Sequence, residues 1–62
     1  MKKVIIFRIN SDKNSIVVKT QEDLDGFLVE SVYWVRVTDA KLATLTVGEE
    51  IEVPEVALNE LG

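Results

Sequence analysis

The stretch FLVESVYWVRVT, residues 27–38, decides the fold, because apolar and polar side chains alternate along it with the two-residue period of a β-strand. The face that this pattern assigns to the core contains Phe27, Val29, Ser31, Tyr33, Val35 and Val37. The opposite face contains Leu28, Glu30, Val32, Trp34, Arg36 and Thr38. Since twelve residues exceed the usual length of a strand, the stretch predicts a bent strand shared by two halves of a small barrel.

The rest of the chain also has strand character, interrupted by turn-forming residues. Two runs rich in branched side chains flank the turn formers NSDKNS, residues 10–15, and predict a hairpin. With two later runs, of which the last ends at Pro54, the predicted strands are 3–9, 16–19, 27–38, 42–47 and 51–53. Five short strands in 62 residues predict an all-β fold, a small five-stranded antiparallel barrel of OB-like or SH3-like type.

The segment before the long strand has an alternative interpretation. Thr20 and Asp23 have the spacing of a capping box, and the apolar residues that follow have helical spacing, which indicates a helix over 21–30 and a ββαββ α+β fold. Gly26 would weaken such a helix by roughly 1 kcal/mol, and Asp25-Gly26 is a natural turn sequence. We therefore expect a turn, with the α+β arrangement as the alternative.

The chain is predicted to form a single domain, 1–62, because 62 residues provide a thin hydrophobic core for one domain at most. Its last segment, 54–62, begins with Pro54 at a plausible first helical position, has Glu55 in the first turn and ends at Gly62. We expect it to form a short acidic tail or a helical turn.

Composition excludes several classes of function. The absence of cysteine and histidine removes disulfides, thiolate and imidazole metal ligands, and catalysis by either residue. Glu50 and Glu52 share a strand face but lack a third ligand or an oxyanion stabiliser. We expect no catalysis, metal, cofactor or small-molecule substrate.

Because Arg8 ends the first apolar run after four residues, neither a signal peptide nor a membrane span is predicted, and we expect a soluble cytoplasmic protein.

Charge is distributed unevenly along this acidic chain, whose formal net charge is −4. Residues 1–37 carry six basic and five acidic side chains, a net of +1, whereas residues 38–62 carry one basic and six acidic, a net of −5. Within the first twenty residues Asp12 is the one acid, and the bases are Lys2, Lys3, Arg8, Lys13 and Lys19. One edge of the fold is therefore predicted to be positive, although a solvated acidic surface explains the overall charge equally well.

Trp34 beside Arg36 is the candidate binding site, because an exposed aromatic ring stacks on a base while a guanidinium meets phosphate. Alternation places Arg8 on the face of Val4 and Ile6, near Arg36 if the first and third strands pair. Lys3 and Lys19 complete the predicted site. The alternatives stay open: a bulge would turn Trp34 into the core, the arginines are solvated or pair with acids, and the lysines protect edge strands.

Three segments together, KKVIIFRI, FLVESVYWVRV and LTVGEEIEVP, followed by an acidic end, resemble the small OB-type single-stranded DNA-binding proteins that phages and mobile elements encode. The resemblance implies stacking and phosphate-binding roles for Trp34, Arg36 and Arg8. It also implies that the acidic terminus competes with DNA or recruits other proteins.

A second hypothesis belongs to a different class of function. Leu28, Val32 and Trp34 lie on one predicted strand face, where apolar side chains gain nothing from contact with water. They predict a protein-interaction or oligomerising patch, covered by a partner or by a second copy in a homodimer. The two hypotheses are compatible, since a dimer would double a sparse positive surface.

Overall fold

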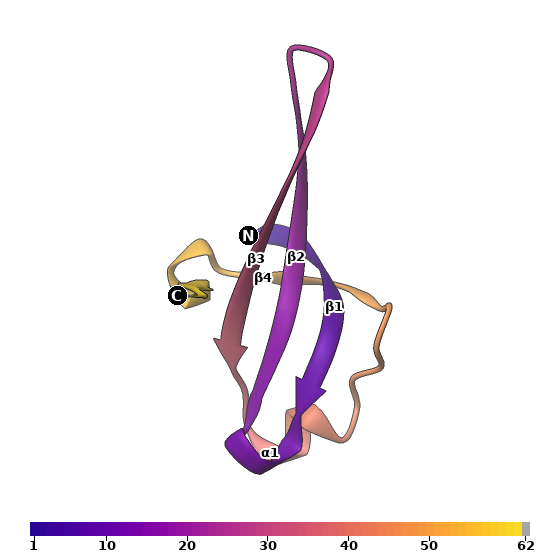
Figure 1. Ribbon diagram of the computed structural model, residues 1–62. Coiled ribbons are helices and arrows are strands. Elements are labelled where there is room, and N and C mark those ends of the chain that lie inside the picture. Colours follow the sequence, from indigo (N-terminus) through magenta and orange to yellow (C-terminus); the bar gives the residue numbers. More distant parts are fainter. Residues whose placement is uncertain (62) are drawn as a thin grey trace.

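The computed structural model describes residues 1–61, which form one antiparallel sheet with short helical segments (Figure 1). The five strands are β1 (Lys2–Asn10), β2 (Ser15–Leu24), β3 (Phe27–Arg36), β4 (Glu50–Val53) and β5 (Asn59–Glu60). The helical segments are the 3-10 turns η1 (Ser11–Lys13) and η2 (Glu55–Ala57) and the single-turn helix α1 (Asp39–Leu42). The all-β, five-stranded antiparallel prediction is confirmed.

The sheet is curved but not closed. Its strand order is β4-β1-β2-β3-β5, so β4 and β5 lie at opposite edges. In Figure 1, β4 passes behind β2 and β3 and crosses their direction, because β1 bends away from β2 and takes β4 with it. The side chains enclosed by this curve form the core, which contains Val4, Ile6, Ile16, Val18, Val35 and Val53. One face of the sheet is thus covered and the other is free.

The bend in β1 coincides with a β-bulge at Phe7. Ile6 lies opposite Val18 and Arg8 lies opposite Val17, so Phe7 is an extra residue without a partner in β2. A bulge exchanges the two faces of a strand beyond it. The prediction that Arg8 shares a face with Val4 and Ile6 is therefore wrong. The first and third strands do not pair either, since β2 lies between them.

The β2–β3 hairpin replaces the helix considered for residues 21–30. β2 and β3 pair without interruption from Ser15 and Arg36 up to Leu24 and Phe27, and the turn residues Asp25 and Gly26 have φ of 51° and 86°. Positive φ at both positions defines a type I′ turn, whose twist matches that of the strands and which Asp-Gly readily adopts. The helix prediction, and with it the ββαββ alternative, is wrong.

The outer part of this hairpin projects beyond the rest of the molecule (Figure 1). Residues 21–30, hereafter the arm, are all exposed, because neither β1 nor β5 pairs with them. Phe27 and Val29, which alternation assigned to the core, lie in the arm and are exposed, whereas Val35 further along the same strand is buried. Alternation identified the face correctly, but the body of the protein ends before the arm begins.

Replacing Gly26 by Ala is expected to loosen the arm. An Ala side chain at positive φ costs roughly 1–2 kcal/mol, which makes opening of the hairpin end about tenfold more frequent. Amide hydrogen exchange of residues 21–30 should accelerate by that factor, while core amides such as that of Val18 should not change. Asp25→Asn, which also tolerates positive φ, is the control. Equal protection in all three proteins would show that the turn does not determine the hairpin.

The second half of the chain departs most from expectation. The predicted strand 42–47 is wrong: Thr38 begins α1 instead, its Oγ1 accepting a hydrogen bond of 3.2 Å from the Lys41 amide. Leu42 and Leu45, half-buried, then pack against the core. The connection returns to β1, where the Gly48 amide donates to the Ile6 carbonyl at 2.8 Å.

The C-terminal segment contains the helical turn expected over 54–62, formed by η2 directly after Pro54. The turn is followed by β5, a strand that the sequence did not indicate, which pairs Asn59 with Trp34 and Glu60 with Tyr33. Gly62 lies outside the described residues. β5 thus covers the edge of β3 next to the candidate site.

Candidate nucleic-acid interface

The candidate residues gather on the side of the sheet turned away from the core, hereafter the outer face. Ile16, Val18 and Val35 are buried on the core side, so the residues that alternate with them point outward. Strand register arranges these outer residues in rows across β1, β2 and β3: Asn10, Ser15 and Arg36; then Arg8, Val17 and Trp34; then Ile5, Lys19 and Val32. Arg8, Lys19, Trp34 and Arg36 are thereby brought together on one surface.

Trp34 is partly exposed on the outer face, which answers the question that the sequence left open. β5 fixes its backbone, because the Asn59 side-chain amide donates to the Trp34 carbonyl at 3.2 Å. Beside the ring lies a depression of about 300 Å³, lined by Asn10, Lys13, Ser15, Val17, Trp34, Arg36 and Leu61. The indole therefore forms one wall of a hollow that also contains two cationic side chains.

Phe7 is a second aromatic side chain of this surface, and sequence reasoning missed it. The bulge leaves it 56% exposed, and its ring centroid lies 5.1 Å from Nζ of Lys19, an outer-face residue. This distance fits a cation–π contact. A signal was present: residues 4–7 are four consecutive apolar side chains, more than one buried strand face can accommodate. The bulge resolves the excess by leaving Phe7 outside.

The basic side chains divide into two groups. Arg8, Lys19 and Arg36 belong to the outer rows, and Lys13 borders the same hollow. Lys3, although predicted for the site, lies opposite Glu52 where β1 meets the edge strand β4, outside the three rows that contain Arg8, Lys19 and Arg36. The structure does not bring Lys3 together with the other four.

Lys2 is engaged on the other side of the sheet. Its Nζ donates a hydrogen bond to the Glu22 carboxylate, the one ion pair within residues 1–61. This contact raises the pKa of Lys2 above its usual value, with nearby Glu55 acting in the same direction. Lys2 therefore contributes nothing to the outer face.

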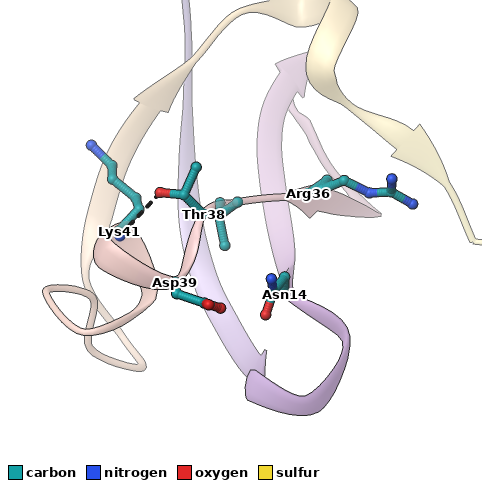
Figure 2. Close-up of a pocket in the computed structure, with 6 residues that line it drawn as sticks. Asn14, Arg36, Thr38, Asp39 and Lys41 are labelled. Carbon is teal, nitrogen blue, oxygen red and sulfur yellow. Dashed lines mark hydrogen bonds between the residues drawn. The ribbon is translucent and has the colours of Figure 1, made fainter.

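A second hollow continues from Arg36 around the end of the sheet (Figure 2). It measures about 600 Å³ and is lined by Asn14, Arg36, Val37, Thr38, Asp39 and Lys41. Figure 2 shows the Arg36 side chain extending away from Asp39, with Lys41 on the far side of Thr38. Arg36 borders both hollows, so they form one surface that leads from Trp34 towards α1.

The apolar patch residues Leu28 and Val32 also lie on the outer face, in line with Trp34 along β3. Val32 is 39% exposed beside Lys19, and Leu28 is 64% exposed in the arm. The structure thus extends the basic and aromatic surface into an apolar one, which ends among the acids of the arm.

No protein-family model matches the chain, and comparisons with curated proteins and with solved structures gave no significant match. Within residues 1–61, no helix is long and apolar enough to cross a membrane. The same residues contain no group of three or more acidic side chains placed to hold a metal ion, and Glu50 and Glu52 are both exposed.

Proposed function

We propose that this protein binds single-stranded nucleic acid, DNA in the first instance, on its outer face and without catalysis. The observation that carries the proposal is the pairing of two accessible aromatic rings, Phe7 and Trp34, with basic side chains on one sheet surface. Every base has a π-face, so such rings bind unpaired bases of any sequence. This is also the function that the resemblance to phage and mobile-element proteins implies.

The two rings are spaced to contact different bases. Phe7 lies on β1 and Trp34 on β3, two strand spacings apart, which is about 10 Å. A strand of nucleic acid crossing the sheet stacks one base on each ring. Arg8, which shares a row with Trp34, and Lys19, which touches Phe7, then lie within reach of the phosphates between them.

The local charge allows this despite the acidic chain. The rows of Arg8 and Arg36 contain no acid, and in the row of Lys19 Glu50 is the one acid, on the edge strand. At physiological ionic strength charges interact over about 8 Å, so the acids of the arm are largely screened at the rows of Arg8 and Arg36, which lie at least four residues further along β3 than Glu30. Glu30 lies one row from Lys19. With four basic groups on this surface, we expect an affinity for nucleic acid that is modest and falls strongly as the salt concentration rises.

Titration of the intrinsic Trp fluorescence with oligo-dT at several salt concentrations tests the proposal. DNA is expected to quench the emission, since Trp34 is the one Trp of the chain and lines the site. If Arg8, Lys13, Lys19 and Arg36 each neutralise one phosphate, log Kd plotted against log salt should have a slope of about 3. Arg8→Gln with Arg36→Gln should halve that slope.

Two controls separate stacking from general attraction to a polyanion. Lys2→Gln removes one positive charge on the opposite side of the sheet, where Lys2 is bound to Glu22, and should leave the slope unchanged. Duplex DNA of the same length offers no unpaired bases and should bind more weakly. Emission that is indifferent to oligo-dT at low salt would refute the proposed function.

A further inference from the structure

The outer face is polarised along its length. Residues 21–30, the arm, carry the acids Glu22, Asp23, Asp25 and Glu30 and no base. Glu22 faces the core side with Lys2, whereas Asp23 and Glu30 alternate onto the outer face, beside Leu28. The other end of the same face carries Arg8, Lys13 and Arg36 with Trp34, while Lys19 and the Phe7 ring that it contacts lie nearer the middle. One end is acidic and apolar, the other basic and aromatic.

From this polarity we infer that two copies of the chain pack their outer faces against each other in antiparallel orientation. A two-fold axis at the middle of the face, near Val32, places the arm of each copy over the basic end of its partner. Asp23 and Glu30 of each copy then lie near Arg8 and Arg36 of the other copy. The two-fold axis repeats this contact, so it forms at both ends of the interface. Because both contacts form in one step, the assembly closes as a dimer and does not extend into a fibre.

The apolar side chains of the face give this contact its core. Phe7, Leu28 and Val32 are all exposed in one copy, and Trp34 is exposed in part. The opposite charges fix the orientation of the two copies. In the antiparallel dimer the apolar side chains are removed from contact with water. The arm lengthens the outer face along the longest dimension of the molecule, which is 39 Å (Figure 1), so both charged ends of the face can be in contact with a partner at the same time.

The dimer and the nucleic acid use the same surface. Dimerisation covers Trp34, Arg8 and Arg36, so oligo-dT and a second copy exclude each other. The inference shares its surface with the proposed function but does not depend on it, since self-association is measured without nucleic acid. If the protein both dimerises and binds nucleic acid on this surface, the dimer is an inactive form, and single-stranded nucleic acid dissociates it into monomers.

Sedimentation velocity over a range of concentrations and salt tests the inference. We expect a dimer at low salt that dissociates as salt rises. Asp23→Asn with Glu30→Gln should raise the dimer Kd at least tenfold, and Arg8→Glu with Arg36→Glu should give a monomer. The matched control is Glu55→Gln with Glu60→Gln, which removes two acids outside the outer face and should leave the Kd unchanged.

A charge exchange distinguishes this arrangement from a contact between arms. Asp23→Lys and Glu30→Lys, added to Arg8→Glu and Arg36→Glu, reverse both ends of the face and should restore the dimer. A monomer at all concentrations, or a dimer indifferent to the arginine variant, would overturn the inference. Oligo-dT binding by a monomeric wild type would leave the proposed function standing, and a charge-dependent dimer that ignores oligo-dT would remove only the proposed function.

Discussion

A protein in which Phe7 and Trp34 are both replaced by Ala is expected to bind oligo-dT at least about thirtyfold more weakly than the wild type. Stacking on one aromatic side chain contributes roughly 1–3 kcal/mol per base, and the two rings lie on different strands, so their losses should approximately add. The minimum sum of about 2 kcal/mol corresponds to that factor. Anisotropy of a labelled oligonucleotide measures it, because the variant has no Trp.

The single variants and a third aromatic residue make the result interpretable. Phe7→Ala and Trp34→Ala alone should each cost at least about fivefold in affinity. Phe27, equally apolar and 74% exposed, lies at the end of the arm, so Phe27→Ala should not weaken binding. Circular dichroism of each variant establishes that it is folded. An unchanged Kd in the folded double variant would show that nucleic acid, if bound, does not stack on this surface.

The sequence predicted those parts of the fold that local chemistry determines. Alternation over 27–38 identified the face with Trp34 and Arg36, and Asp25-Gly26 specified the turn that joins β2 to β3. Each depends on residues close together in the chain. The strand expected over 42–47 failed because its Leu residues reach the core from a helix and a loop, and period alone does not distinguish these from a strand.

The site was predicted in part, for a related reason. Arg36 and Trp34 follow from the alternation of one strand, but Arg8 and Phe7 depend on a bulge that exists because β1 bends to carry β4 around the core. The bulge is a consequence of tertiary packing, so the face of every residue after Ile6 could not be assigned from β1 alone. The polarity of the outer face was equally hidden, since it needs the length of the arm and the register of β2 with β3.

Ile16→Ala is expected to cost about 2–5 kcal/mol of unfolding free energy. Ile16 is fully buried on the central strand β2, between Ile9 of β1 and Val35 of β3, so its truncation leaves a cavity that the sheet cannot close. A domain of 62 residues at 0.05–0.15 kcal/mol per residue has roughly 3–9 kcal/mol in total. The variant should therefore be only marginally folded. Urea denaturation monitored by Trp fluorescence measures its free energy of unfolding.

Graded substitutions show whether the loss comes from packing at this position. Ile16→Val removes one methylene group and should cost about 0.5–1.5 kcal/mol, whereas Val56→Ala, at a residue 95% exposed, should stay within about 0.5 kcal/mol of the wild type. Within residues 1–61 the core contains six buried apolar side chains, so none of its neighbours can compensate for Ile16. A cooperative transition within 1 kcal/mol of the wild type for Ile16→Ala would contradict this packing. Because the rows of the outer face are held in register by the same β2 residues, Ile16→Ala should also weaken oligo-dT binding in proportion to the fraction unfolded.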